Sequence, residues 1–339
     1  MHNILVTGGT GYIGSHTVVD LLDKGYNPII VDNQSNSSLD VLDGIKTITG
    51  VDVNCHSIDI CDKDALTQVF QENAIHGVIH FAAYKSVNES VNEPLKYYHN
   101  NLTGLITLLD VMDTQGVPRL IFSSSCSVYG NVKTLPVTEE TPFAPAESPY
   151  GRSKQIGEKL IEDFAKAHPQ FRGINLRYFN PAGAHESNVI GELSPLPPTN
   201  LVPVITETGI GKRTGMTVFG DDYDTVDGSC IRDYIHVMDL AAAHTQALTA
   251  LGQLDDSHNI EVYNVGIGQG VSVLQAITAF EECSDIELNY QIGPRRAGDV
   301  IAIYADTTKV MSNLGWQPTR NIDDIMRTAW AWEVKRNKP

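Results

Sequence analysis

The sequence has 339 residues, of which 42% are hydrophobic and 19% are charged, and this composition excludes an extensively disordered chain. The length allows a large hydrophobic core and either two domains or one large domain with a smaller lobe. Lys and Arg number 24 and Asp and Glu 41, which gives a net charge of −17. Such a charge argues against nucleic acid or an anionic membrane surface as the partner.

The five cysteines are an odd number and form no C-x-x-C pair, which indicates free thiols in a reducing compartment, and we expect a cytoplasmic protein. The segment Met1–Gly8 has no basic region before its short apolar run, so it predicts a strand and not a signal peptide. No stretch approaches the roughly 20 apolar residues of a membrane-spanning helix. His76 and His80 have the spacing of a helical metal-binding pair but lie in or beside a predicted strand, so we expect no metal.

Short β-branched segments alternate with longer helical patterns along the first half of the chain. This alternation predicts βαβ units and a doubly wound parallel sheet of the Rossmann type, an α/β fold. The predicted strands are Asn3–Thr7, Asn27–Asp32, Asp52–Ser57, Gly77–Phe81, Leu120–Ser123 and Gly173–Tyr178. The predicted helices are Tyr12–Lys24, one that Asp62 caps and that runs to about Asn73, one over about Glu93–Gln115, and one that Ser148 and Pro149 open.

The regular pattern breaks after Asn180, where Pro, Gly and Ser become frequent. We predict a smaller α/β lobe from this point, with regular structure resuming at Asp233–Asp239, a helix to about Ala250 and a strand near Val262–Val265. Residues 1–180 with about 232–266 are therefore expected to form the Rossmann domain. Residues about 181–231 with 267–339 are expected to form the lobe.

Three glycines with the spacing G-x-x-G-x-x-G, Gly8, Gly11 and Gly14, lie between the first predicted strand and the helix that follows. Glycine lets a chain turn tightly there and brings backbone N–H groups and a helix N-terminus to a pyrophosphate. Asp32 ends the second strand 18 residues after Gly14. A carboxylate there accepts hydrogen bonds from a ribose diol and repels a 2′-phosphate, so the pattern favours NAD over NADP.

Tyr150 and Lys154 lie at positions i and i+4 of a predicted helix and hence on one face. An ammonium beside a phenol favours the phenolate, so this pair indicates a general base. Ser125 ends a serine triplet after the fifth strand, where α/β sheets present functional groups. A second Tyr-x-x-x-Lys, Tyr129 and Lys133, has Gly130 inside it and is interpreted as a coincidence.

An arginine pair precedes Ala297, Gly298 and Asp299 in this acidic chain. Guanidinium groups form paired hydrogen bonds with phosphate oxygens, so Arg295 and Arg296 are candidates for binding a phosphate.

These motifs together resemble the extended short-chain dehydrogenase/reductases and, more narrowly, their UDP-glucose 4-epimerase branch. The likeness runs from Ile4 to about Trp332. It is carried by Thr7–Gly14, Asp32-Asn33, His80–Ala83, Ser123–Ser125, Val128–Gly130, Tyr150–Lys154, Arg177–Pro181 and Arg232–Val237.

The resemblance implies an isomerase that interconverts UDP-glucose and UDP-galactose with a tightly bound NAD. The sugar would be oxidised at C4 to a 4-ketose, turn, and take hydride back on its opposite face. Tyr150 would be the base, Ser125 would bond the same sugar oxygen, and Lys154 would hold the nicotinamide ribose and tune Tyr150. The first domain would bind NAD and the lobe the UDP-sugar.

The resemblance also implies two sets of binding residues. The NAD contacts would include Gly8, Gly11, Tyr12, Ile13, Gly14, Asp32, Asn33, Asp59, Ile60, Phe81, Ala82, Lys85, Asn100, Tyr150, Lys154 and Phe179. The substrate contacts would be Ser125, Tyr150, Asn180, Asn200, Phe219, Arg232, Arg296 and Asp299. A homodimer would pair the helices near Glu93–Gln115 and Pro149–His168.

Two departures from the family pattern bear on specificity. Ile303 occupies a position where relatives carry a bulky aromatic or a small residue beside the sugar 2-substituent, so activity on N-acetylated sugars is left open. Cys126-Ser127 follows the serine triplet, where a nucleotide-sugar 4,6-dehydratase would need an Asp-Glu pair. That dehydratase and a non-catalytic NAD-binding module are the alternatives, and the second would be expected to lose Tyr150, Lys154 or Ser125.

Overall fold

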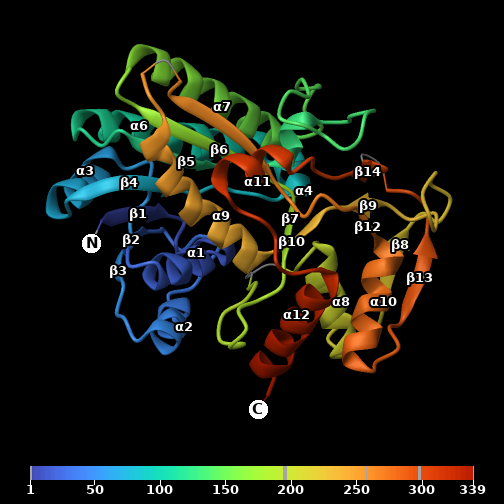
Figure 1. Cartoon of the computed structure of the whole chain (residues 1–339). Helices are drawn as coiled ribbons and strands as arrows, with labels where there is room; N and C mark the ends of the chain where they lie inside the picture. The colour runs from blue at the N-terminus through green and yellow to red at the C-terminus, as the bar shows by residue number, and fades with distance from the viewer. Residues whose placement is uncertain (1, 194–196, 257, 297–298, 339) are drawn as a thin grey trace.

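The fold is built around one parallel sheet of seven strands, as the computed structural model shows for residues 2–193, 197–256, 258–296 and 299–338 (Figure 1). The order of the strands is β11-β6-β5-β4-β1-β2-β3. Their bounds are β1 Asn3–Thr7, β2 Asn27–Val31, β3 Asn54–His56, β4 Ile75–His80, β5 Arg119–Ser123, β6 Arg172–Tyr178 and β11 Ile260–Val265. The predicted doubly wound parallel sheet is confirmed.

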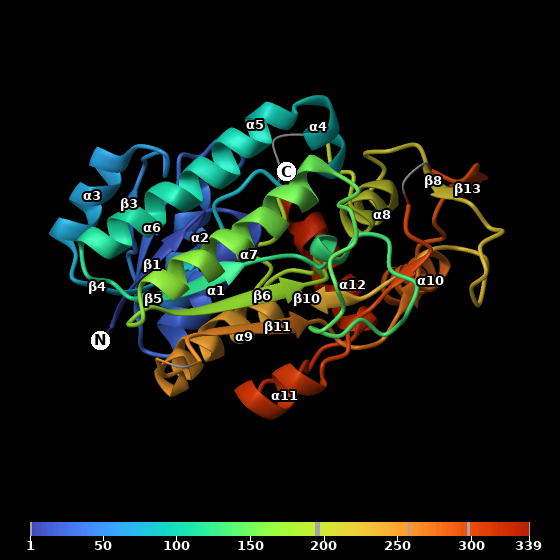
Figure 2. The ribbon, with the colours of Figure 1, turned by 90° about the horizontal axis from the view of Figure 1, so that it is seen from above.

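Helices cover both faces of this sheet, because its strands are apolar on both sides. One face is covered by α1 (Tyr12–Asp23), α2 (Asp40–Thr49) and α9 (Val237–Ala250). The other is covered by α3 (Lys63–Glu72), α6 (Gly104–Thr114) and α7 (Pro149–Ala167). Figure 2 shows α6 and α7 as neighbours across this second face.

The long predicted helix over Glu93–Gln115 is three segments in the structure. α5 (Pro94–Tyr98) passes into a π-helical stretch, His99–Thr103, and then into α6. A short helix, α4 (Val87–Asn92), precedes α5. The π-helical stretch carries Asn100, one of the predicted NAD contacts.

The C-terminal lobe packs around a third apolar core, formed by its three longer helices and their strands. The helices are α8 Leu201–Gly209, α10 Val273–Ser284 and α12 Ile322–Arg336, with α11 Thr308–Leu314 packed beside β11. The short strands pair as β10-β7, β12-β9-β14 and β13-β8. Their bounds are β7 Asn180–Ala182, β8 Met216–Phe219, β9 Ile231–Arg232, β10 Tyr234–His236, β12 Val271–Ser272, β13 Tyr290–Gly293 and β14 Ala302–Ile303.

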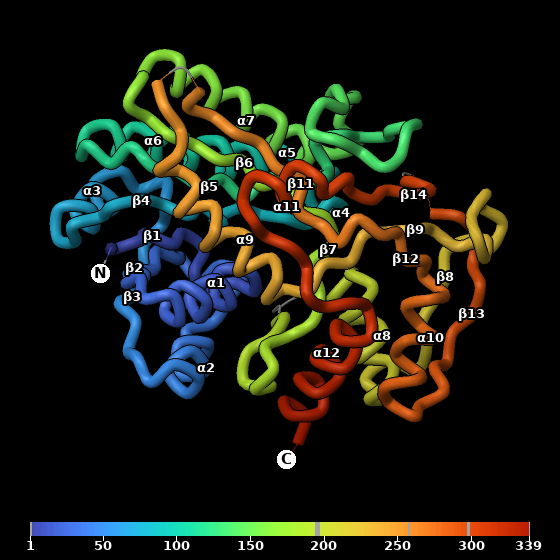
Figure 3. The backbone as a smooth tube through the Cα atoms, in the orientation of Figure 1, coloured from blue at the N-terminus to red at the C-terminus, as the bar shows by residue number. Residues whose placement is uncertain are grey.

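The chain crosses between sheet and lobe more than once (Figure 3). After β6 it enters the lobe, and it returns to the sheet as β11, which pairs with β6 from Ile260 to Val265. The division into domains stays a prediction, and this pairing supports assigning residues near 260 to the sheet. The expected lack of regular structure between Asn180 and Asp233 was wrong, because α8 and β8 lie there.

Candidate active site

The glycine loop is closed so tightly that side chains do not fit at two of its positions. Gly8 has φ +71°, and a Cβ there would lie 2.8 Å from the backbone nitrogen of Ala82. A Cβ at Gly14 would lie 2.2 Å from the carbonyl oxygen of Gly8. Within the described residues no side chain caps the first turn of α1, which starts after Gly11. The N–H groups of that turn, at Tyr12 and Ile13, are therefore suited to an anionic ligand.

Asp32 stands beside this loop, directly after β2. Its carboxylate accepts hydrogen bonds from the backbone nitrogens of Thr10, at 3.1 Å, and Gln34, at 2.9 Å. The amide of the next residue, Asn33, donates to the carboxylate of Asp59 at 3.0 Å. Asp32 and the predicted NAD contacts Asn33 and Asp59 therefore lie together at the carboxyl ends of β2 and β3, with Ile60 buried next to Asp59.

The other predicted NAD contacts lie along the same edge of the sheet. Phe81 follows β4 and packs against His244 of α9, with ring centroids 4.6 Å apart. The backbone nitrogen of Ala82 donates to Thr7 Oγ1 at 3.3 Å, and Asn100 donates to Asn101 at 2.9 Å.

Two further predicted contacts connect the cofactor side to the lobe. The hydroxyl of Tyr12 donates to the carbonyl of Gly183 at 2.6 Å. The ammonium of Lys85 lies 5.9 Å from the centre of the Tyr12 ring and 3.4 Å from the carboxylate of Glu192. Asn200, a predicted substrate contact, donates to the same carboxylate at 3.2 Å. Tyr12 of α1 and Asn200 at the start of α8 are thus linked through the Lys85 ammonium and the carboxylate of Glu192.

The three predicted catalytic residues lie together in the interior, at the carboxyl end of β5. Tyr150 is in the first turn of α7, which Ser148 caps by accepting a hydrogen bond from Gly151 N at 3.1 Å. Tyr150, Lys154 and Ser125 are all buried. Burial raises the pKa of Tyr150 to about 12, although a hydrogen bond with Ser125 lowers it. Ser125 therefore contacts the predicted base.

Lys154 lies one helical turn beyond Tyr150, but its ammonium points to another partner. It donates to the carbonyl of Ser123 at 2.5 Å and lies 4.7 Å from the centre of the Phe122 ring. Burial lowers the pKa of Lys154 to about 8, while the carboxylate of Glu158 raises it. Besides burial, the groups that shift the pKa of Tyr150 are Ser125 and Cys126. The tuning of Tyr150 by Lys154 therefore stays a prediction.

Three residues that the sequence analysis did not select also belong to this site. Tyr178 ends β6, and besides burial the nearby Tyr150 raises its pKa. Cys126 is close enough to raise the pKa of Tyr150, and burial raises the pKa of its own thiol to about 12. Glu158 acts on Lys154. Its spacing on the helix, four residues after Lys154, was a signal available in the sequence.

The predicted substrate contacts on the lobe are partly paired with one another. Arg296 lies in two hydrogen bonds with Asp299, at 3.1 and 2.7 Å, and 5.4 Å from the ring centre of exposed Phe219. Arg232 donates to the carbonyl of Val300 at 2.6 Å and lies 3.9 Å from Asp299. The structure thus brings Phe219, Arg232, Arg296 and Asp299 together. Ala297 and Gly298 lie outside the described residues.

Phe179 and Asn180 follow β6, where the chain passes from the sheet to the lobe. The backbone nitrogen of Asn180 donates to the carbonyl of Asp233 at 2.9 Å. Its Oδ1 atom is buried and, within the described part of the chain, has no hydrogen-bond partner. Phe179 is buried in one apolar cluster with Ile303, which pairs with Arg232 between β14 and β9. The position of Ile303 near the sugar stays a prediction.

The second Tyr-x-x-x-Lys does not form a matching pair. Tyr129 is buried and donates to Asn264 Oδ1 at 2.6 Å, whereas Lys133 is exposed. Among the residues that the structure describes, no group of three His, Cys, Asp or Glu side chains is arranged to hold a metal ion. In the same residues no helix has the length and apolar character needed to cross a bilayer.

The sheet, the glycine loop and the buried Ser-Tyr-Lys group define a dinucleotide-dependent enzyme site. Residues 5–329 match the family model described as GDP-mannose 4,6 dehydratase. The chain is 48% identical over 330 residues to a UDP-glucose 4-epimerase of Dictyostelium discoideum, covering 97% of this chain and 95% of that protein. It is 46% identical to one of Bacillus subtilis, covering 97% and 96%.

Solved structures give the same result. The chain matches a UDP-glucose-4-epimerase from Stenotrophomonas maltophila with bound NAD and formylated UDP-arabinopyranose, at TM-score 0.96, 43% identity and 99% coverage of both chains. It matches one from Bifidobacterium longum in complex with NAD⁺ and UDP at TM-score 0.93, 45% identity and 98% coverage of both. The chain belongs to the extended short-chain dehydrogenase/reductases and, within them, to the UDP-glucose 4-epimerase family.

Proposed function

We propose that the protein interconverts UDP-glucose and UDP-galactose by transient oxidation at C4, with NAD held throughout turnover. The observation that carries this proposal is the burial of Tyr150, Ser125 and Lys154 together at the carboxyl end of β5, on the edge of the sheet that holds the glycine loop. The names of its relatives and the ligands in their solved structures support it.

The residues of the cofactor side fit NAD. Gly8 and Gly14 leave room at the first turn of α1 for a pyrophosphate, which the N–H groups of Tyr12 and Ile13 would bind. Asp32 would accept hydrogen bonds from the ribose diol, and Lys154 would hold the nicotinamide ribose. When bound, NAD supplies the acceptor and donor of hydride.

Tyr150 takes the proton from the sugar 4-hydroxyl and returns it to the oxygen of the product. Ser125, which lies close enough to Tyr150 to lower its pKa, holds the same sugar oxygen. Because burial raises the pKa of Tyr150 to about 12, a base at neutral pH requires a further positive charge nearby. We propose that the ammonium of Lys154 provides it by turning away from the Ser123 carbonyl when the site is filled.

The lobe would hold the UDP part. Arg232 and Arg296 would bind the diphosphate oxygens and Phe219 would stack on the uracil ring. The unpartnered Oδ1 of Asn180 supplies a buried acceptor for the ligand. Asn200 and Asp299 would complete the set. Since Arg296 and Asp299 are already paired, binding would exchange internal contacts for contacts with the substrate.

The test is to incubate the purified protein with UDP-galactose, without added NAD, and to assay for UDP-glucose. We expect UDP-glucose to form with no net NADH. A stoichiometric rise in NADH would show a dehydrogenase, and a 4-keto-6-deoxy sugar would show the 4,6-dehydratase that the family model's description names. Cys126-Ser127 argues against elimination, because neither residue supplies the acid pair. Retained NAD without any turnover would show a non-catalytic module.

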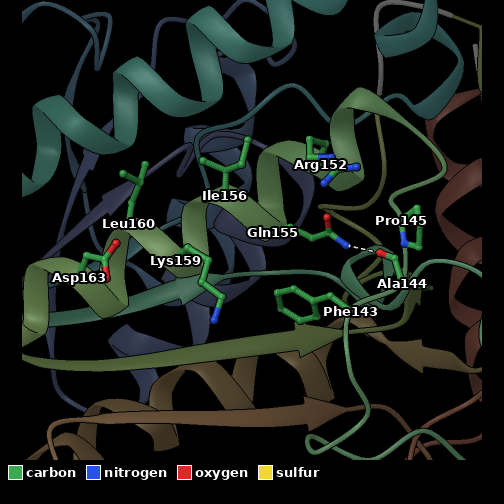
Figure 4. Close-up of a pocket in the computed structure, with 9 residues that line it drawn as sticks. All are labelled: Phe143, Ala144, Pro145, Arg152, Gln155, Ile156, Lys159, Leu160 and Asp163. Carbon is green, nitrogen blue, oxygen red and sulfur yellow. Dashed lines mark hydrogen bonds between the residues drawn. The ribbon is translucent and has the colours of Figure 1, made fainter.

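We also propose a homodimer and a cytoplasmic location. Ile106 on α6 is 52% exposed and Leu95 on α5 is 80% exposed. Figure 4 shows a pocket on the outer side of α7 whose lining includes the apolar residues Phe143, Ile156 and Leu160. A second copy of the chain would cover these surfaces. The five cysteines, all free, support a reducing compartment.

A further inference from the structure

The three serines at the carboxyl end of β5, of which Ser123 is the last residue of the strand, contact three different partners. Successive side chains of an extended chain point to opposite faces. Accordingly, Ser123 Oγ bonds His244 Nε2 on α9 at 2.7 Å, whereas Ser124 Oγ donates to Glu158 Oε1 on α7 at 2.5 Å. Ser125 Oγ accepts a hydrogen bond from Ser127 N at 3.2 Å and lies close enough to Tyr150 to lower the pKa of its phenol. The strand end that carries Ser125 is therefore tied to a helix on each face of the sheet.

Glu158 is the more heavily bonded of the two anchors. Its side chain is 0% exposed and is paired with Arg177 of β6, whose Nε lies 3.0 and 3.2 Å from the two carboxylate oxygens and whose Nη2 lies 2.7 Å from Oε2. Arg177 also donates to the hydroxyl of Tyr129 at 3.0 Å. A buried carboxylate stays charged only with such partners. A fixed negative charge therefore lies within α7.

That charge lies on the helix face that carries Tyr150 and Lys154, since residues 150, 154 and 158 are four apart. It raises the pKa of Lys154 against the effect of burial. From β4, His80 faces Lys154 as a neutral group, because burial and then the Lys154 ammonium lower the pKa of that histidine to about 3. From β6, Tyr178 lies near Tyr150, which besides burial raises the pKa of Tyr178. β5 presents the Ser123 carbonyl and the Phe122 ring to Lys154.

We propose that Glu158 is a positioning residue for this reaction: through Ser124 it fixes the strand end that carries Ser125 and the Ser123 carbonyl, and with its negative charge it keeps the Lys154 ammonium protonated. The proposal rests on the function proposed above. Neither the family motifs nor the binding contacts required a role for Glu158.

The test separates this role from simple stabilisation. Glu158→Gln alone leaves Arg177 buried without a counter-charge and is expected to destabilise the fold. The double variant Glu158→Gln/Arg177→Met removes both charges and leaves none unpaired. The matched control is Asp239→Asn/Arg320→Met, which removes another acid–arginine pair, 2.6 Å apart, in which the acid is buried and the arginine partly exposed and which joins α9 to the segment before α12.

The first readout needs no activity. In protein labelled with ¹³C at lysine Cε, the resonance of Lys154 is assigned by its loss in Lys154→Met and is titrated with pH. We expect the titration midpoint of Lys154 to fall by about 1 pH unit or more in Glu158→Gln/Arg177→Met. In the control Asp239→Asn/Arg320→Met the midpoint should be unchanged. An unchanged midpoint in a folded double variant would overturn the electrostatic part of the proposal, whether or not the protein epimerises UDP-sugars.

The second readout is steady-state kinetics. Ser124→Ala keeps the ion pair and removes only the tie to β5, so we expect kcat to fall about 10-fold with KM for UDP-galactose nearly unchanged. In Glu158→Gln/Arg177→Met the alkaline limb of the kcat profile should move to lower pH together with the Lys154 midpoint. Wild-type kcat in folded Ser124→Ala would overturn the positioning part. Absence of epimerisation in the wild type would instead reject the proposed function.

Discussion

The two sides of the site are built in different ways. On the cofactor side, the shape comes from the backbone: Gly8 and Gly14 are packed against Ala82 N and the Gly8 carbonyl with no space for a methyl group. On the substrate side, the polar side chains bond one another, as Arg296 bonds Asp299 and Asn200 bonds Glu192. The first surface is preformed, whereas the second would exchange partners if it binds the UDP-sugar as proposed.

This difference predicts different responses to substitution. A backbone cradle fails when one methyl group is added, because the clashing atoms cannot move aside. A surface of exchangeable side chains loses affinity by steps, one contact at a time. The catalytic residues between the two sides should show the largest effects, since they act on the reacting atoms.

Tyr150→Phe should have the largest effect. If Tyr150 is the base, as proposed, its loss should lower kcat by about 10²–10⁴, with little change in UDP-sugar affinity, because the phenol would contact the reacting hydroxyl. Kinetics with UDP-galactose and binding of UDP measure the two quantities. Tyr129→Phe is the control and should lower kcat far less, since the Tyr129 hydroxyl donates a hydrogen bond to Asn264 and accepts one from Arg177. Near-full activity of Tyr150→Phe would reject the assignment.

Gly14→Ala should disrupt the cofactor side. The added Cβ lies 2.2 Å from the Gly8 carbonyl oxygen, and such overpacking costs about 1–3 kcal/mol, so NAD retained after dialysis should fall about 5- to 150-fold. The NAD content of purified protein, read by absorbance after release, measures this. Gly252→Ala is the matched control, because nothing lies within 4 Å of its added Cβ. Equal NAD content in both variants would contradict a preformed cradle.

Ile303 should set the sugar range on the other side. Since it is buried with Phe179 beside Arg232, an added N-acetyl group should be disfavoured by about 5- to 150-fold in kcat/KM relative to UDP-galactose. Ile303→Ala should lower the ratio of kcat/KM for UDP-galactose to kcat/KM for the N-acetylated UDP-sugar, and Ile303→Tyr should raise it. Measuring both substrates with all three proteins is the test. A constant ratio would place the determinant elsewhere in the lobe.

Arg296→Ala should have the smallest effect of the four. Its guanidinium is exposed and paired with Asp299. Binding the diphosphate would therefore break hydrogen bonds to Asp299, and this loss offsets part of the gain in binding free energy. We expect KM for UDP-galactose to rise about 10-fold with kcat nearly unchanged. Arg295→Ala, which loses a surface pair with Asp222, is the control. A fall in kcat without a change in KM would remove Arg296 from the binding set.

The sheet could be predicted because each strand–helix unit is specified by local pattern, as in Asn3–Thr7 and the glycine loop after it. α2 was missed because Gly44 interrupts its helical pattern; its glycine is required by contact with Ile190, where a Cβ would lie 2.5 Å away. α8 was missed because Pro197 and Pro198 lie shortly before it and Pro203 lies in its first turn. Both depend on contacts that sequence periodicity does not contain.

The proposed catalytic pair could be selected from the sequence because Tyr150 and Lys154 share one helix. The proposed substrate contacts were not, since Arg232 and Arg296 are distant in the chain and come together with Asp299 only when the lobe folds, so resemblance alone supplied them. The direction of the Lys154 ammonium, toward Ser123, depends on how β5 ends against α7. That packing is a property of the three-dimensional structure.

The central claim is that hydrogen leaves C4 of the sugar and returns to the same carbon without entering solvent. The most direct test converts two forms of UDP-galactose together in ordinary water. One form carries deuterium at C4, and the other has no deuterium but carries ¹³C in its uridine part. The account predicts UDP-glucose that keeps its deuterium at C4, with none transferred to the ¹³C-labelled molecules. Loss of deuterium to water, or its appearance in the other substrate, would contradict it.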